Sequence, residues 1–222
     1  MRSGKVNREP DVADELSRHS LTRLHTLTDC VFALCLLLLV VFIEKPAASM
    51  AATEEAIRHY LFGQVDIMMA YAVAFVNIAF YWFFSHNIGK YLRRSDNVHV
   101  WLTLLTLLFV GLLPFANGVN AAFPQSLTVH LFYSSMVFLV GLVFCADWLY
   151  ATRKDRLVDR SLGVGTVEGL IVESLVQPIA ALLSLGGAFI STFCWGLPLL
   201  LVPFAIFAVN KTRDRYRQRR DA

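Results

Sequence analysis

Two ionisable side chains, His25 and Asp29, stand at the start of an otherwise apolar stretch of the chain. They are four residues apart, so on a helix they share a face and are able to pair. Every residue from Cys30 to Ile43 is apolar. A carboxylate inside a membrane helix is costly and usually faces protein or water rather than lipid. Asp29 therefore either makes a structural hydrogen bond at the inner end of a helix bundle or attracts cations. The residues alone do not decide between these two roles.

Other polar side chains interrupt later apolar runs. We expect Asp147 and Glu173 to lie near the inner membrane interface, where water is close. Asn77 lies deeper, and we expect it to hydrogen-bond to a neighbouring helix. If the protein were a proton-coupled transporter, Glu173 would be the best candidate for the essential ionisable group.

The chain carries none of the motifs of the common soluble enzymes. It has no Walker loop, dinucleotide fingerprint, zinc-protease helix or nucleophile elbow. Its four cysteines form no C-x-x-C pair and lie in or beside apolar runs, which favours buried small hydrophobes over metal or disulfide chemistry; they are Cys30, Cys35, Cys145 and Cys194. We therefore expect neither an enzyme nor a bound metal or cofactor.

The elements that carry these residues are long apolar runs. The chain has 222 residues, of which 56% are hydrophobic, and a mean hydropathy of +0.55. About 20 apolar residues are enough for one helix to cross the hydrocarbon core. The sequence predicts an all-α, polytopic membrane protein with six transmembrane helices per subunit, over 24–43, 65–85, 99–119, 128–149, 170–190 and 193–210.

The basic residues predict the topology. With six spans, 18 of the 20 Lys and Arg residues fall on the side that holds both termini, which is a strong positive-inside signal. We therefore expect a multi-pass protein of the cell membrane with a cytoplasmic tail at 1–22, a channel domain at 23–210 and a basic cytoplasmic tail at 211–222. A basic tail beside a membrane helix favours anionic lipid headgroups over nucleic acid as its partner.

Two connections outside the spans are also informative. The fifth and sixth spans are separated by only a few residues, which predicts a tight antiparallel hairpin. On the outer side, residues 47–61 are expected to form a short helix at the membrane surface.

Three apolar residues of the first span share one stripe. Leu34, Leu38 and Val41 follow one another at helical spacing, and Cys30 lies one turn before Leu34 on the same line. Such a stripe is compatible with lipid contact or core packing. It is also compatible with a hydrophobic constriction, which forms when several copies of the helix surround an axis.

The first span resembles the signature of the transmembrane protein 175 potassium channel family, in its short prokaryotic form. That signature is an Arg, three residues, Phe-Ser-Asp, then a small residue and an apolar helix. Here it reads Arg23, Leu24-His25-Thr26 and Leu27-Thr28-Asp29. Further similar motifs follow in the family's order, over roughly 23–120: Tyr81-Trp82, His86, Arg93, Arg94, Asp96, Trp101-Leu102 and Leu112-Leu113-Pro114-Phe115.

The resemblance implies a homotetramer in the lipid bilayer that conducts potassium ions passively through a central pore lined by the first helix. It implies that Leu34, with Leu38 and Val41, forms the narrowest point. It also implies that one set of residues packs the inner ends of the helices together: Arg23, Leu27, Thr28, Asp29, His86 and Trp101. Leu37 departs from the family pattern, since a Thr linked to potassium preference is usual there.

Three functions therefore remain open. The first is a potassium-preferring cation channel with a hydrophobic constriction on the first helix. The second is a proton-coupled membrane transporter. The third is a non-conducting membrane scaffold, which the apolar Leu37 keeps in consideration.

Overall fold

The computed structural model describes residues 12–41, 43, 45–46, 53–159 and 163–220. The part of the chain that it describes is almost wholly helical, with one short 3-10 turn and an isolated antiparallel bridge between two loops. The helices are α1 (Val12–Val41), α2 (Glu54–Gly63), α3 (Val65–Gly89), α4 (Asn97–Ala122), α5 (Leu127–Thr152), η1 (Arg153–Asp155), α6 (Val164–Gly187) and α7 (Thr192–Arg220).

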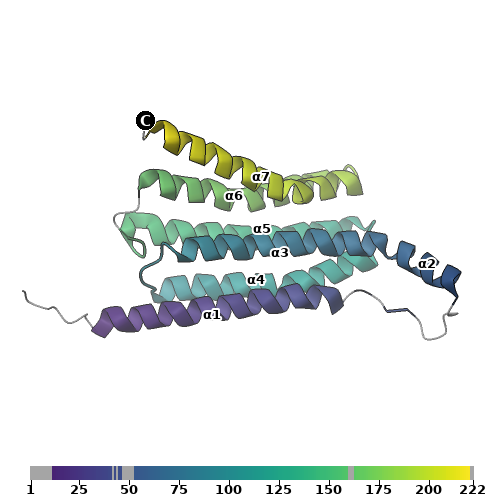
Figure 1. Cartoon of the computed structure of the whole chain (residues 1–222), viewed down its shortest axis with the longest axis horizontal. Helices are drawn as coiled ribbons and strands as arrows, with labels where there is room; N and C mark the ends of the chain where they lie inside the picture. The colour runs from purple at the N-terminus through teal and green to yellow at the C-terminus, as the bar shows by residue number, and fades with distance from the viewer. Residues whose placement is uncertain (1–11, 42, 44, 47–52, 160–162, 221–222) are drawn as a thin grey trace, which may run out of the picture.

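Six of these helices lie side by side and alternate in direction (Figure 1). The start of α1 and the end of α7 lie at the same end of the bundle, and α2 lies at the opposite end. The six predicted spans are confirmed, because six helices of the described chain are long and apolar enough to cross a membrane: Ser17–Val41, Ile67–Gly89, Asn97–Ala122, Leu127–Asp155, Gly165–Gly187 and Thr192–Val209. We call the end that holds both termini the inner end.

The first and last helices extend beyond the predicted spans. α1 begins at Val12 rather than near residue 24, and α7 runs to Arg220 rather than ending near residue 210. The added segments are polar, and that of α7 is rich in Arg, which is a good helix former in water. Hydropathy marks where a helix leaves the membrane, and here the helix continues past that point.

The short outer helix is present at α2, but only part of its predicted range is described. Residues 47–52 lie outside the described residues. The Thr53 side chain accepts a hydrogen bond from the backbone N–H of Ala56 at 3.3 Å, which caps the helix. Glu54 and Glu55 in the first turn complement the helix dipole. α2 buries none of its residues, and its main contact with the bundle is with α3, as expected of a helix at the membrane surface.

The packing places α1 at the edge of the subunit. It contacts α4 and α3, while α5 packs between α4 and α6, and α6 pairs with α7 (Figure 1). The core between these helices is formed by fully buried side chains, among them Phe32, Ile78, Val110, Val137 and Trp148. α1 therefore has one face against protein and one face away from it.

The predicted hairpin of the last two helices is also confirmed. Only four residues, 188–191, separate α6 from α7. The two helices approach so closely at Gly187 that a Cβ there would overlap the Cys194 carbonyl group, 2.6 Å from its carbon. At Gly186, by contrast, a Cβ would meet no atom within 4 Å. Gly187 is therefore required by the close approach, and Gly186 is not.

Two loops are joined at the inner end of the bundle. Leu92 and Val158 form an antiparallel bridge, and the Arg93 backbone N–H donates to the Leu157 carbonyl at 2.9 Å. The Arg93 guanidinium also lies 3.1 Å from the Asp159 carboxylate. This ion pair is largely exposed, so it contributes little to stability, and the backbone pairing holds the loops.

Asp96 joins the same loop region to two helices. One carboxylate oxygen accepts from the His99 backbone N–H at 3.0 Å and caps α4, and the other accepts from the Tyr150 hydroxyl of α5 at 2.6 Å. The Arg156 guanidinium donates in turn to the Tyr150 oxygen at 2.8 Å. Burial by itself raises the pKa of Asp96, but these hydrogen bonds outweigh it and leave the pKa below its ordinary value.

Replacing Gly187 by alanine should destabilise the hairpin. Because the added methyl group meets backbone atoms that cannot rotate away, we expect a cost of about 1–3 kcal/mol. Thermal unfolding in detergent should show a lower melting temperature for Gly187→Ala. The matched control, Gly186→Ala, should melt like the unchanged protein, and equal melting of both variants would contradict the close approach.

The lowered pKa of Asp96 predicts an acid-dependent contribution to stability. The charged form is favoured in the folded state, so the contribution is complete above the unfolded pKa of about 3.9 and is lost as the pH falls through the lower folded value. Asp96→Asn should therefore melt below the unchanged protein at pH 7, and the gap should narrow below about pH 4. Asp155→Asn, an exposed carboxyl nearby, should show no gap, and a gap independent of pH for Asp96→Asn would refute this account.

Candidate functional site

One face of α1 is buried against α4 and α3. Its buried residues recur at helical spacing: Leu21, Leu24, Thr28, Phe32, Cys35 and Leu39. The Cys35 thiol lies 3.6 Å from the Val110 carbonyl of α4, and the Thr28 hydroxyl donates to the Leu24 carbonyl one turn earlier at 2.9 Å. Both polar groups are thus satisfied inside the hydrocarbon layer, where an unpaired group is costly.

The opposite face of α1 is apolar and exposed on the single chain. Leu34, Leu38 and Val41 have exposed fractions of 58%, 46% and 69%, and Leu37 is also exposed. The predicted stripe therefore points away from the subunit's own core. Core packing within the subunit is excluded as its role, and lipid or other copies of the chain remain as its neighbours.

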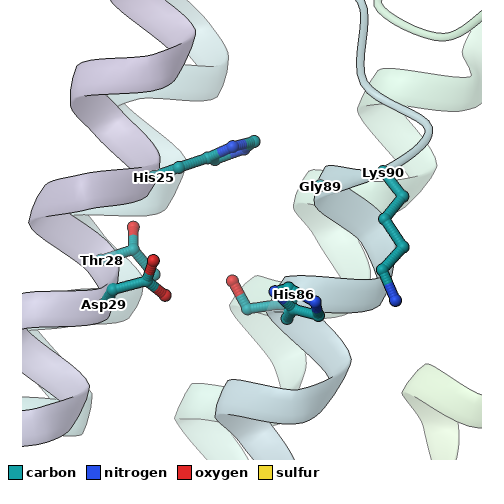
Figure 2. A pocket seen from close by; sticks show the side chains of 7 residues that line it. His25, Thr28, Asp29, His86, Gly89 and Lys90 are labelled. Atoms are coloured by element: carbon teal, nitrogen blue, oxygen red, sulfur yellow. The ribbon is translucent and has the colours of Figure 1, made fainter.

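A hollow of about 320 Å³ lies between α1 and α3 at the inner end of this helix. Figure 2 shows His25, Thr28 and Asp29 on α1 and His86 and Gly89 on the facing end of α3, with the Lys90 side chain on the side of α3 away from α1. Polar side chains dominate its wall. The hollow therefore suits water better than an apolar ligand.

The Asp29 carboxylate is held by α3 rather than by its own helix. The Trp82 indole N–H donates to one Asp29 oxygen at 2.8 Å, and the Trp82 ring stacks on His86 with 5.6 Å between ring centroids. No hydrogen bond joins His25 to Asp29 in the described part of the chain, although both line the hollow. The sequence suggested the His25 pair because of its spacing. Trp82 belongs to one of the family-like motifs, but nothing in the sequence signalled its bond to Asp29, which is 53 residues away.

The structure brings some of the predicted packing residues together within one chain and leaves others apart. Asp29 and His86 share the hollow with Thr28. Arg23, Leu27 and Trp101 lie on the exposed surface of the subunit, and Trp101 is 72% exposed. Any role of these three in packing would therefore involve lipid or another copy of the chain.

A second polar pair was not predicted. His99 of α4 and Asp147 of α5 are 2.7 Å apart through Nδ1 and a carboxylate oxygen, with side chains only 4% and 14% exposed. The pair links adjacent helices near the inner end, in agreement with the expected position of Asp147. The sequence indicated the depth of Asp147 in the membrane but not its partner, because 48 residues separate Asp147 from His99.

Asn77, which was expected to bond to a neighbouring helix, makes a different hydrogen bond. The Asn77 side chain donates to the Val73 carbonyl of its own helix at 2.8 Å, rather than to a neighbouring helix. The helices are instead joined through the Asn77 backbone, whose carbonyl accepts from the Gln177 side chain at 3.2 Å. Short polar side chains readily bond to the preceding helical turn, which explains the difference. Glu173, one turn from Gln177, is buried with 4% of its surface exposed.

Comparison with known proteins gives matches in sequence and in fold. Residues 23–114 match the model of the family described as the endosomal/lysosomal potassium channel TMEM175. A protein of Streptomyces collinus named a potassium channel is 26% identical over 191 residues, which cover 84% of this chain and 89% of that protein. A potassium channel of Chamaesiphon minutus is 24% identical over 174 residues, which cover 77% of this chain and 85% of that protein.

Solved structures show the same fold. A crystal structure described as a lysosomal potassium-selective channel TMEM175 homolog from Chamaesiphon minutus has a TM-score of 0.74 at 21% identity, covering 86% of this chain and 99% of that one. A variant of the potassium channel MtTMEM175, crystallised with a nanobody fusion, has a TM-score of 0.57 at 18% identity, covering 99% of this chain and 96% of that one. In sequence over 23–114 and in fold over most of its length, this multi-pass membrane protein resembles the TMEM175 potassium channel family.

Proposed function

We propose that this protein is a potassium-preferring cation channel of the cell membrane. One observation carries the proposal: α1, which bears the family signature, buries one face in its own subunit and leaves a continuous apolar face exposed. The relatives named as potassium channels support it. In a homotetramer, four copies of α1 surround one axis and form the pore.

The constriction follows from the side chains on that face. Leu34, Leu38 and Val41 lie on one line, so four copies of the helix form successive apolar rings. Branched apolar rings of small diameter shed water, and a dewetted segment is a barrier to ions. Leu37, next to the stripe, keeps this part of the pore apolar where the family usually has a hydroxyl. The resting pore is therefore narrow and dry.

The inner entrance is polar and acidic. The Asp29 carboxylate is exposed, is held in place by Trp82, and lies about one turn before the apolar rings begin. Asp29 faces the hollow beside α3 and does not lie on the apolar stripe of α1, so its carboxylate attracts cations to the inner end of the subunit and does not line the apolar rings. Arg23, Leu27 and Trp101, exposed on the single chain, pack against the neighbouring copy in the tetramer.

The orientation follows from charge. The inner end carries the clusters of Lys and Arg around 90–94, 153–160 and 211–220, and we assign this end to the cytoplasm by the positive-inside rule. Both tails, 1–22 and 211–222, then lie in the cytoplasm, and 23–210 form the channel domain. In this arrangement the Asp29 hollow opens toward the cytoplasm.

The channel proposal is tested by ion flux into liposomes that hold the purified protein. Leu34→Ala should increase potassium flux several-fold and lower the ratio of potassium to sodium flux, because the apolar ring becomes wider. Leu183→Ala is the matched control: Leu183 is equally exposed, at 61%, but lies on α6, so its flux should equal that of the unchanged protein.

Two results would overturn the proposal. Potassium flux that stops when a protonophore collapses the proton gradient would identify coupled transport instead of passive conduction. Absence of flux in both the unchanged protein and Leu34→Ala would identify a scaffold. Native mass spectrometry measures the oligomer directly, and a mass other than that of four chains would exclude the tetramer.

A further inference from the structure

A second hollow, of about 450 Å³, lies near the outer ends of α3, α4, α5 and α7. Its lining comes from the start of α7, the start of α3, and individual residues of α4 and α5. Apolar side chains dominate the lining, including Met69, Val73, Phe193 and Leu200, and no charged side chain of the described residues lines it. Its volume falls in the range of small-molecule sites between the helices of bundles.

Polar groups without partners face this hollow from α4 and α5. Asn117 and Asn120 are only 4% and 6% exposed, and neither side chain makes a hydrogen bond within the described chain; the Asn120 carbonyl oxygen is fully buried as well. The hydroxyl of the buried Tyr133 also lacks a hydrogen bond to any described residue. Buried polar groups are nearly always paired in native proteins, so these three side chains offer unused hydrogen-bonding capacity to a ligand in the hollow.

The polar groups immediately behind the hollow are paired with one another and with the backbone. The Trp195 indole N–H donates to the Ser134 hydroxyl at 2.9 Å, and the Ser184 hydroxyl donates to the Trp195 carbonyl at 2.6 Å. His130 bonds to the Pro124 carbonyl at 3.0 Å. These groups behind the hollow are paired with protein, whereas Asn117, Asn120 and Tyr133 line the hollow without a side-chain hydrogen bond to any described residue. Other buried side-chain atoms of the described residues also lack a partner, among them Asn77 Oδ1, Trp148 Nε1 and Gln177 Oε1.

We propose that this hollow binds an uncharged glycerolipid with free hydroxyl groups, its acyl chain between α3 and α7 and its hydroxyls bonded to Asn117, Asn120 and Tyr133. The absence of charged lining residues disfavours an ionised headgroup, which would be desolvated without a counter-charge. The apolar walls disfavour water as the sole occupant, because a dry apolar surface gives water no partners. The amides and the phenol offer both donors and acceptors, as a hydroxyl requires.

The site is independent of the proposed pore. The pore face of α1 lies on the other side of α3 and α4, and none of its residues lines this hollow. A binding experiment therefore tests the site whether or not the protein conducts.

The experiment uses the full-length protein in lipid nanodiscs and a monoacylglycerol that carries a diazirine in its chain. After illumination, mass spectrometry of peptides locates the label. We expect saturable labelling of residues 69–73 and 192–200 that unlabelled monoolein displaces. A fatty-acid probe of the same chain length, which carries a carboxylate in place of the glycerol, should label these segments several-fold less.

Two variants challenge the site in different ways. Asn120→Leu keeps the branched shape of the side chain but replaces the amide by methyl groups. Gly196→Leu fills the hollow, and a Cβ at Gly196 would meet no atom within 4 Å, so the change does not disturb the packing. Both should reduce labelling several-fold. Gly186→Leu, equally open but outside the hollow, is the control and should label normally, and equal melting temperatures establish that all three variants are folded.

Three outcomes would overturn the proposal. The first is labelling spread evenly over the lipid-facing helices. The second is labelling that neither Asn120→Leu nor Gly196→Leu reduces. The third is equal labelling by the fatty-acid probe, which would show that the chain alone is recognised and that the asparagines bind nothing.

Discussion

The structure depends on one constraint, which is that the hydrocarbon core of a membrane offers no hydrogen bonds. Each backbone group must therefore be paired within its own helix, and each polar side chain must find a partner or face water. Six helices satisfy the first requirement. The second explains why Thr28 bonds to its own helix and why His99 and Asp147 form a pair across two helices.

The same constraint gives the two ends of the bundle different characters. At the inner end, polar side chains bond across helices, as Asp29 does with Trp82 and Asp96 with Tyr150, and one hollow is left with a polar wall. At the outer end hydrogen bonds also join the helices, as between Trp195 and Ser134, but the hollow there has mainly apolar walls with three polar groups in its lining. A hydrated entrance fits the inner end, and a lipid fits the outer one.

α1 shows how far sequence reasoning reaches. Its length, its family signature and the shared face of Leu34, Leu38 and Val41 could all be predicted, because helical periodicity fixes which residues lie together on one helix. The sequence could not predict whether that face packs against its own subunit, because periodicity does not say which stripe of an apolar helix packs inward. Only the contacts of Phe32, Cys35 and Leu39 with α3 and α4 decide that the stripe is exposed.

The sequence by itself determined the helical class, the six spans, the common side of both termini and the resemblance to a channel family. These depend on hydropathy, charge and motifs, which are local along the chain. The tertiary structure alone decided that Asp29 is bonded by Trp82 rather than by His25, that His99 pairs with Asp147, and that Asn117 and Asn120 open into a hollow. The physical reason is the same in each case: partners about 50 residues apart are selected by the rotation and depth of packed helices, and no local pattern records either quantity.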